Sequence, residues 1–254
     1  MKGVILAGGT GSRLHPLTLV TNKHLLPVYD WPMIYYPINT LIGMGVKEIC
    51  IVLGGNSVGD IVNLLGDGNQ FGVHITYVHQ SYAGGIAHAL KLTENFCGED
   101  DFIVVLGDNV LLKSPDISGL LAPSIFITTS YHPQDFGVVT MEATDGVERI
   151  THIVEKPEDP TSSWIQTGVY AYSKSVWSKL DSIHVSKRGE LEITDLNCLF
   201  IEDGNLGVVK LEQNTWFDAG LRGSLVDCGI MVRVAKNNGF FDSFLEIYDT
   251  KEVW

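Results

Sequence analysis

Hydrophobic and polar residues alternate in blocks along the first half of the chain, and the blocks have two different periods. Continuous apolar runs occupy residues 4–7, 48–53, 73–78 and 102–106, which is typical of buried strands. Residues 32–44, 57–65 and 83–96 instead carry their apolar side chains at helical spacing. Strands that alternate with helices in this order predict a doubly wound, largely parallel sheet with helices on its faces.

The second half has a different pattern, in which strand-like runs follow one another closely. Residues 125–130, 137–141, 149–155 and 167–172 are separated by turn signals such as Asp145-Gly146 and Pro157. Helical spacing returns at residues 175–180, 191–201 and 221–236, and Asn238-Gly239 is a C-cap signal for the last of these helices. We therefore expect antiparallel strands to be added to the sheet in this half.

Composition and charge narrow the class of protein. The 254 residues are 45% hydrophobic, enough for one large α/β domain, which we expect residues 1–254 to form. The chain has 17 Lys and Arg and a net charge of -13, which argues against nucleic acid or an anionic membrane as a partner. Its four cysteines form no CxxC pair, so free thiols are expected. With no signal peptide and no apolar run of ~18 residues, we expect a soluble, cytoplasmic protein.

A glycine-rich segment, Gly8-Gly9-Thr10-Gly11-Ser12-Arg13-Leu14, directly follows the first predicted strand. Its three glycines allow a sharp turn that exposes backbone N–H groups, and Arg13 and Lys23 add positive charge. The segment lacks the Gly-Lys-Ser/Thr of a Walker loop and the third glycine of a dinucleotide loop. A tight connection explains the glycines alone, but together with the two cations they indicate a phosphate site.

Two aspartates that follow predicted strands are candidates for a divalent cation. Asp108 comes after the run 102–106, which places it at the same sheet edge as the glycine-rich segment, and Asp218 lies in the segment 216–220. Each aspartate could instead have a purely structural role, Asp108 by hydrogen-bonding the backbone of a turn and Asp218 as a helix N-cap. Beside a phosphate site, one or two carboxylates are what Mg²⁺ prefers, so the pair indicates a magnesium site.

Polar residues at two further strand ends complete the candidate chemistry. Lys156, in Glu155-Lys156-Pro157, could meet a second phosphate, although such a charged pair at a turn is commonly exposed and contributes little. Gln80 can both donate and accept, which suits the imide edge of a pyrimidine, although a capping or solvent-facing role also explains it. His24 and His88 have no paired metal ligand and are interpreted as packing or surface residues.

Five motifs in a fixed order resemble those of the sugar-1-phosphate nucleotidyltransferases, and the resemblance covers nearly the whole chain. It implies a Rossmann-like α/β fold and Mg²⁺-dependent transfer of a deoxythymidylyl group from dTTP to α-D-glucose 1-phosphate, giving dTDP-glucose and pyrophosphate. It also suggests a homo-oligomer, for which the apolar segments 31–36 and 240–241 could supply contacts. The motifs are Leu6-Ala7-Gly8-Gly9-Thr10-Gly11-Ser12-Arg13-Leu14 with Lys23 and Pro27, Gly107-Asp108-Asn109, Glu155-Lys156-Pro157, residues 188–195 and residues 216–220.

The resemblance also implies roles for single residues, position by position. Arg13, Lys23, Asp108 and Lys156 would be catalytic, and Asp108 and Asp218 would bind magnesium. The sugar phosphate would contact Asn109, Gly137, Glu155, Lys156 and Val169. The nucleotide would contact Leu6, Ala7, Gly8, Gly9, Gly11, Ser12, Arg13, Gln80, Gly85 and Asp108.

Several departures from the family pattern keep the substrate open. His88 stands where a glutamine is usual, and residues 164–168 read Trp-Ile-Gln-Thr-Gly where Tyr-Ala-Val-Thr-Gly is customary. The chain ends at Trp254, without the extra helical segment that builds a regulatory nucleotide site in longer members. Uridylyl, cytidylyl or guanylyl transfer and a non-catalytic paralogue that binds nucleotide sugars are alternatives. A glycosyltransferase is a further one, but residues 108–110 lack the DxD pair that its metal site usually has.

Overall fold

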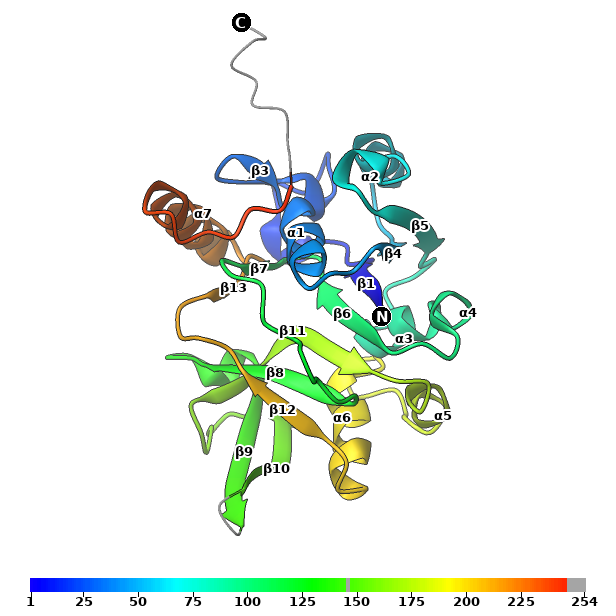
Figure 1. The fold of residues 1–254 in the computed structure, drawn as a ribbon, viewed down its shortest axis with the longest axis vertical. Helices are drawn as coiled ribbons and strands as arrows, with labels where there is room; N and C mark the ends of the chain where they lie inside the picture. The colour runs from blue at the N-terminus through cyan, green and yellow to red at the C-terminus, as the bar shows by residue number, and fades with distance from the viewer. Residues whose placement is uncertain (145–146, 246–254) are drawn as a thin grey trace, which may run out of the picture.

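The computed structural model describes residues 1–144 and 147–245, and its centre is one nine-stranded sheet (Figure 1). In the parallel half of this sheet, β1 lies between β4 and β6, and β5 pairs with β4. These are the four strands that the apolar runs of the first half predict, and their carboxyl ends share one edge. Their bounds are β1 (Lys2–Ala7), β4 (Glu48–Leu53), β5 (His74–His79) and β6 (Phe102–Leu106).

The other half of the sheet is mostly antiparallel, as predicted. β11 (Trp164–Tyr172) pairs with β6, and also with β8 (Ser124–Thr129) and β9 (Gly137–Thr144). β10 (Val147–Glu155) forms a hairpin with β9. β12 (Gly207–Lys210), which is not among the predicted strands, runs parallel to β8. The sheet is therefore the mixed α/β sheet of the expected fold class.

Two small strand pairs lie outside the main sheet, and one of them shapes the functional site. β7 (Asn109–Leu111) pairs with β13 (Trp216–Asp218), which sets Asp218 directly opposite Asn109. Because Asn109 follows Asp108 in the chain, this pairing brings the two candidate metal-binding aspartates to one place. The second pair is β2 (Pro27–Val28) with β3 (Trp31–Pro32).

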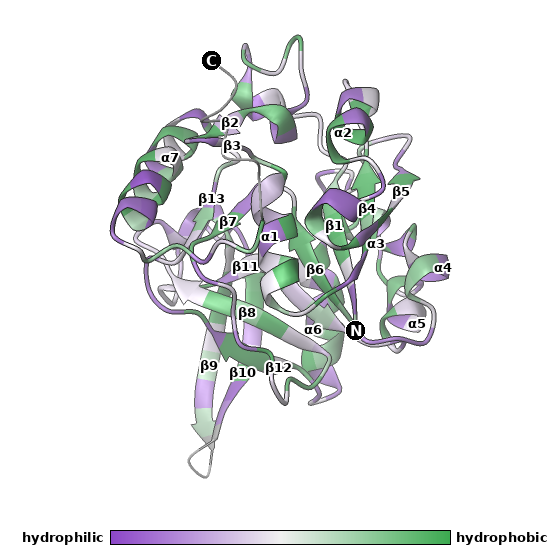
Figure 2. Cartoon of the chain, turned by 45° about the horizontal axis from the view of Figure 1, so that its top comes forward, coloured by the Kyte–Doolittle hydropathy of each residue, from purple (hydrophilic) through white to green (hydrophobic). Residues whose placement is uncertain are grey.

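Helices cover both faces of the sheet, so its central strands β1, β4 and β6 are buried on both sides. Side chains alternate along β1: Ile5 packs in one hydrophobic cluster and Leu6 in the other. Figure 2 shows these central strands as largely hydrophobic. The first cluster includes α1 (Tyr35–Gly43), α2 (Val58–Leu65) and α7 (Arg222–Asn237); the second includes α3 (Ile86–Lys91), α5 (Val176–Leu180) and α6 (Ile193–Glu202). Shorter helical turns are α4 (Glu94–Cys97) and the 3₁₀ turns Ser12–Leu14, Lys23–Leu25, Asn69–Phe71 and Pro133–Asp135.

Two expectations are wrong. The helix predicted at residues 83–96 is divided into α3 and α4, because the hydroxyl of Thr93 donates to the backbone oxygen of Leu90 and the chain turns there. The aromatic residues of segment 31–36, expected at a subunit contact, are internal: Trp31 is 8% exposed, Tyr36 is fully buried, and both pack edge-on against the half-buried Phe241. These aromatic side chains stabilise the fold of one chain rather than presenting an apolar surface.

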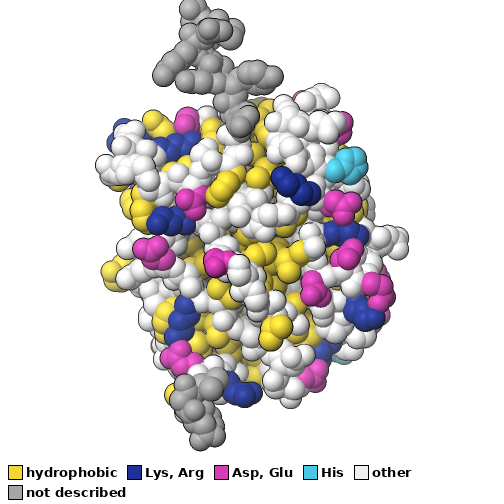
Figure 3. Space-filling view, in the orientation of Figure 1, with side chains coloured by type: hydrophobic (Ala, Val, Ile, Leu, Met, Phe, Trp, Pro, Cys, Tyr) yellow, Lys and Arg dark blue, Asp and Glu magenta, His cyan; other side chains and the backbone are white. Residues whose placement is uncertain are grey.

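Other general expectations can be compared with the described residues. All four cysteines have free thiols, as predicted. Within residues 1–144 and 147–245, every helix is too short or too polar to cross a membrane. On the face shown in Figure 3, Lys and Arg side chains lie interspersed with Asp and Glu.

Candidate active site

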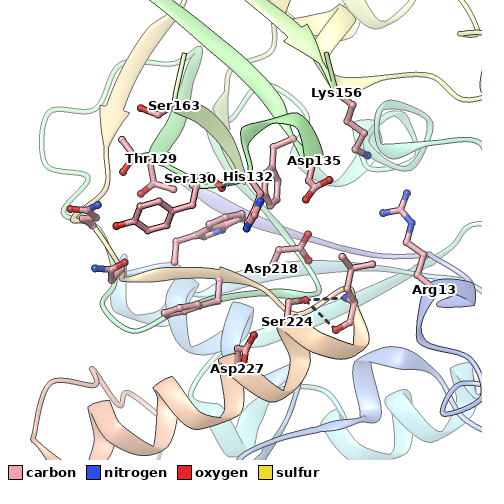
Figure 4. Close-up of a pocket in the computed structure, with 18 residues that line it drawn as sticks. Arg13, Thr129, Ser130, His132, Asp135, Lys156, Ser163, Asp218, Ser224 and Asp227 are labelled. Atoms are coloured by element: carbon pink, nitrogen blue, oxygen red, sulfur yellow. Dashed lines mark hydrogen bonds between the residues drawn. The ribbon is translucent and has the colours of Figure 1, made fainter. Parts of the chain in front are cut away.

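Three adjoining cavities follow the sheet edge at which β1, β5 and β6 end. They enclose about 980, 220 and 200 Å³. Arg13, Lys156 and Asp218 line both the first and the second cavity, and Asp108 lines the second and the third. The three cavities are therefore parts of one cleft. Figure 4 shows Arg13 and Lys156, from opposite sides of the first cavity, extending toward the same space.

The third cavity is built around the glycine-rich segment, where the missing side chains make room. A Cβ atom on Gly8 would lie 2.0 Å from Oε1 of Gln80, so this close approach requires glycine. Gly11 has a φ of 69° and its carbonyl accepts from the hydroxyl of Thr18 at 2.7 Å. Of the predicted nucleotide-binding residues, Ala7, Gly11 and Ser12 line none of the three cavities. Those that line the third cavity are Leu6, Gly8, Gly9, Gln80, Gly85 and Asp108, together with Lys23.

Gln80 is held by its neighbours in one amide orientation. Its Nε2 atom lies 2.9 Å from Nδ1 of His88 and 3.4 Å from the backbone oxygen of Gly85, which can only accept. The His88 ring is itself stacked on Tyr82, with ring centroids 4.4 Å apart. Because Nε2 already donates to His88 and Gly85, the atom of the Gln80 amide that can bind a ligand is the acceptor Oε1.

Asp108 and Asp218 form a pair of half-buried carboxylates, and Lys23 lies beside them. Lys23 Nζ lies 2.6 Å from Oδ2 of Asp108. Burial opposes the ionisation of Asp108, but the charge and hydrogen bond of Lys23 together with the neighbouring His24 and a backbone hydrogen bond outweigh it, and the pKa of Asp108 is lowered to about 2. Burial and the negative charge of Asp108 raise the pKa of Asp218 to about 6. The repulsion between the two carboxylates therefore lowers stability, and a further positive charge between them would reduce this repulsion.

The space between these carboxylates fits a divalent cation. A Cβ atom on Gly220 would lie 2.8 Å from Oδ1 of Asp218 and 3.1 Å from Oδ2 of Asp108. Both carboxylates therefore border the space that is left open because residue 220 has no side chain. Across the described ranges 1–144 and 147–245, His, Cys, Asp and Glu form no metal-binding group of three or more. Two carboxylates are nevertheless enough for Mg²⁺ when phosphate oxygens complete its shell.

His24 packs directly behind this carboxylate pair. Its Nδ1 donates to Oδ1 of Asn22 at 2.7 Å, and Asn22 donates in turn to the backbone oxygens of Gly54 and Asn56. Burial and the charge of Lys23 lower the pKa of His24 to about 3, so the ring is neutral. The residue acts in packing, as interpreted from the sequence.

The second cavity brings together the predicted sugar-phosphate residues Gly137, Glu155 and Lys156. Lys156 has a φ of 46°, a left-handed conformation that costs a non-glycine residue roughly 1 kcal/mol and marks a constrained turn at the end of β10. Oε1 of Glu155 lies 3.2 Å from Nη2 of Arg188 and 3.5 Å from Nζ of Lys156. Its Oε2 accepts from the hydroxyl of Thr194 at 2.7 Å, so this carboxylate is held at both oxygens.

Asn109 is predicted to contact the sugar, but its side chain is already engaged within the protein. Its Oδ1 accepts from the backbone N–H of Gly168 at 2.9 Å and from Nε1 of Trp216 at 2.6 Å. The residue is 2% exposed, although it lines the second cavity. Asn109 therefore ties β7 to β11 and β13.

Val169, which the resemblance assigns to the sugar phosphate, is placed differently from Gly137, Glu155 and Lys156. Its side chain is fully buried in the hydrophobic cluster that contains α1 and α2, and it lines none of the three cavities. Side chains alternate along a strand, and Gly168 and Tyr170, on either side of Val169 in β11, line the second cavity together with Gln166. An irregularity in the pairing of β11 with β8 between Gln166 and Tyr170 makes the face of each residue hard to infer from spacing.

Three residues in or beside the cleft make contacts that the sequence analysis does not predict. Arg188 lines the second cavity and binds both oxygens of Glu192; the resemblance includes its segment, residues 188–195, as a motif but implies no role for Arg188 itself. His88 orients Gln80, and Gln166 lies at the wall of the second cavity. The available signal was the departure of His88 and Gln166 from the family pattern.

Comparisons with known proteins agree with this geometry. Residues 2–232 match the family model described as nucleotidyl transferase. A glucose-1-phosphate thymidylyltransferase of Neisseria meningitidis is 38% identical over 245 residues, covering 93% of this chain and 84% of that protein. The protein of the same name from Mycobacterium tuberculosis is 38% identical over 243 residues, covering 92% and 82%.

Solved structures show the same relationship. A crystal structure from Bacillus anthracis, assigned as a glucose-1-phosphate thymidylyltransferase in complex with sucrose, superimposes with a TM-score of 0.84 at 42% identity, covering 92% of this chain and 95% of that one. A UDP-glucose pyrophosphorylase bound to UDP-glucose gives a TM-score of 0.79 at 22% identity, over 93% of this chain and 98% of that one, which shows the shared fold alone. With this fold, and with a family model that spans most of its length, the chain belongs to the nucleotidyl transferase family.

Proposed function

We propose that this protein transfers a deoxythymidylyl group from dTTP to α-D-glucose 1-phosphate, in a magnesium-dependent reaction that gives dTDP-glucose and pyrophosphate. The names of relatives that match most of the chain support this reaction. The observation that carries the proposal is one cleft lined by Arg13, Lys23 and Lys156 together with the paired carboxylates of Asp108 and Asp218. Such a cleft can offset the repulsion between two phosphate-bearing reactants.

Gln80 supports a base that carries a ring N–H. Thymine presents a donor at N3, which Oε1 of Gln80 could accept, whereas cytosine presents a lone pair at N3 and would leave two acceptors facing each other. A buried acceptor left without a donor costs about 1–3 kcal/mol. Uracil shares the imide edge of thymine, so UTP is the second candidate for the nucleotide.

The charged side chains would divide between the two reactants. Arg13 and Lys23, on the glycine-rich side, would hold the triphosphate, and Lys156 would hold the phosphate of the sugar. A phosphate oxygen of glucose 1-phosphate then attacks the α-phosphorus, and the bond from that phosphorus to the pyrophosphate oxygen breaks. The attacking oxygen is ionised at neutral pH, so the protein has no proton to remove. Asp108 and Asp218 would hold the magnesium ion, whose positive charge stabilises the phosphates.

The sugar would lie in the second cavity, against Gly137 and Glu155. Glu155 is fixed by Arg188 and Thr194, so its carboxylate can accept hydrogen bonds from sugar hydroxyls in one direction only. Holding the sugar in this way aligns its phosphate for attack, which is where transfer reactions of this kind gain most of their rate.

Release of pyrophosphate tests the proposal. Purified protein with Mg²⁺ and glucose 1-phosphate should release pyrophosphate from dTTP faster than from UTP, CTP or GTP. Asp108→Asn should lower kcat by about a thousandfold, because it removes one of the two carboxylates, whereas Lys47→Ala, at an exposed lysine outside the cleft, should behave like the wild type. Nucleotide binding without any turnover would instead indicate a non-catalytic paralogue.

We also propose that the protein acts as a homo-oligomer in the cytoplasm. Free thiols at all four cysteines are compatible with a reducing compartment. Light scattering of the purified protein would give the mass in solution, and a mass of 27.9 kDa, that of one chain, would contradict the oligomer.

A further inference from the structure

Gln166 lies where the wall of the sugar cavity meets the protein interior. It is 6% exposed, lines the second cavity, and rests against the backbone of Gly137, where a Cβ atom would come within 2.3 Å of its Nε2. The absence of a side chain at Gly137 is therefore what allows the Gln166 amide to occupy this place. Both ends of that amide are engaged by neighbouring polar side chains.

Four hydrogen bonds connect the hydrophobic core to the carboxylate of Glu155 through this amide. The hydroxyl of Tyr172 donates to Oδ1 of Asn197 at 2.7 Å, and Nδ2 of Asn197 donates to Oε1 of Gln166 at 3.1 Å. Nε2 of Gln166 donates to the hydroxyl oxygen of Thr194 at 2.6 Å, and that hydroxyl donates to Oε2 of Glu155 at 2.7 Å. Tyr172 and Asn197 are fully buried, and Thr194 is 2% exposed.

The direction of these bonds is fixed from end to end. An ionised carboxylate can only accept, so Thr194 gives its one proton to Glu155, and its oxygen therefore accepts from the Gln166 amide. An amide is suited to this position because it accepts at one end and donates at the other. Every donor in this series of four hydrogen bonds thus points toward Glu155, and hydrogen bonds aligned in this way strengthen one another.

We propose that Gln166 is a positioning residue for the sugar site: acting through Thr194, it fixes the Glu155 carboxylate and so sets how strongly the protein binds the sugar part of its ligand. This inference rests on the proposed function, which places the sugar against Glu155. Arg188 holds the other oxygen of Glu155, so the loss of Gln166 leaves the Thr194 hydroxyl free to turn and only the Arg188 side of the carboxylate firmly fixed.

The consequence is a separation between two kinds of ligand. A nucleoside diphosphate without a sugar does not reach Glu155, so its affinity should be independent of Gln166. A nucleotide sugar does reach Glu155, and the part of its affinity that comes from the sugar should depend on Gln166. The ratio of the two dissociation constants isolates this part and needs no turnover.

Calorimetric titration of dTDP and of dTDP-glucose into the wild type, Gln166→Leu and Gln166→Glu tests the proposal. Leucine removes both ends of the amide, and glutamate keeps the acceptor but loses the donor. Both variants should weaken dTDP-glucose about tenfold, which corresponds to about 1.4 kcal/mol, and leave the affinity for dTDP unchanged, because without the amide donor the Thr194 hydroxyl no longer fixes the carboxylate of Glu155.

Thr194 provides a second pair of variants in case Gln166 variants fold poorly. Thr194→Ser keeps the hydroxyl and should behave like the wild type, whereas Thr194→Val has the same shape without the hydroxyl and should lose the sugar-dependent gain. Thr93→Val, at a buried threonine between α3 and α4, should lower stability without changing either affinity.

The outcomes separate this inference from the proposed function. A wild type that gains affinity from the sugar, together with Gln166→Leu and Thr194→Val variants that keep the same gain, would overturn the role of Gln166 alone. A wild type that binds neither ligand would overturn both. Loss of affinity for dTDP in equal measure would show that Gln166 merely holds the fold together.

Discussion

The nucleotide side and the sugar side of the cleft are built in different ways. On the nucleotide side, the ligand-facing groups lie in short segments directly after β1, β5 and β6, and neighbouring parallel strands bring them together. On the sugar side, they come from antiparallel strands and from α6, and hydrogen bonds such as that between Gln166 and Thr194 join them across the chain. The first arrangement follows from local motifs, while the second depends on how distant segments meet.

Lys23 and Lys156 allow a direct comparison of the two sides, because they are the same residue type in the same cleft. Lys23→Ala should have the larger effect of the two, lowering kcat/KM by about a hundredfold to a thousandfold with a raised KM for dTTP. It removes a phosphate partner and also leaves the half-buried carboxylate of Asp108 without its cation. Steady-state kinetics with dTTP as the varied substrate gives both constants, and a change confined to the KM for glucose 1-phosphate would place Lys23 on the wrong side.

Lys156→Ala should have a smaller and complementary effect. The KM for glucose 1-phosphate should rise by about tenfold to a hundredfold while the KM for dTTP stays unchanged, because a charge-assisted contact to one phosphate is lost. The same assay with the sugar phosphate varied measures it. If both lysine variants raised the same KM, the division of the cleft into two sides would be incorrect.

This division also explains what the sequence predicts. The parallel strands, Asp108, Lys156 and the glycine-rich segment are readable because each is a local pattern of apolar or glycine residues followed by a polar one. The contacts of Gln166 with Thr194 and of Arg188 with Glu155 cannot be read in this way, because the partners lie 28 or more residues apart in the sequence. The surroundings of Val169 depend on an irregularity in strand pairing, which leaves no local pattern. The contacts of Asn109 cannot be read from the sequence for the same reason. Its Oδ1 accepts from Gly168 and Trp216, which are distant in the sequence.

Where the two sides meet, the paired aspartates should make stability depend on pH. The pKa of Asp218 is raised from 3.8 to about 6, so between these values the folded protein holds this proton more tightly than the unfolded chain does. The resulting contribution to stability is present at low pH and is lost as the pH rises through about 6. At pH 8 without divalent cations, Asp218→Asn should therefore be more stable than the wild type by on the order of 1–2 kcal/mol.

Thermal unfolding in a chelator at pH 8 and at pH 4 measures this difference, which should vanish at pH 4. Added Mg²⁺ should raise the Tm of the wild type and not that of Asp218→Asn, because the cation relieves the same repulsion. Asp227→Asn, at an exposed aspartate of the first cavity, is the matched control and should show neither effect. Equal stability of the wild type and Asp218→Asn at pH 8 would contradict the half-buried carboxylate pair.

The smallest effect expected is on the nucleotide side, at His88. His88→Phe keeps a ring for stacking on Tyr82 but removes the atom that accepts from Gln80. The Gln80 amide can then rotate, so the KM for dTTP should rise a few-fold and the preference over CTP should fall. Parallel assays with both nucleotides test this, and an unchanged preference would show that Gly85 alone holds the amide.

A crystal structure of the protein with dTDP-glucose and Mg²⁺ tests the central claim most directly, namely that the two sides hold the two halves of one nucleotide sugar. The account predicts the thymine N3 within hydrogen-bonding distance of Oε1 of Gln80, the glucose against Glu155, and the diphosphate between Lys156 and the paired aspartates. A ligand that occupied the first cavity beside Tyr131 and His132, with Gln80 and Glu155 both untouched, would contradict it.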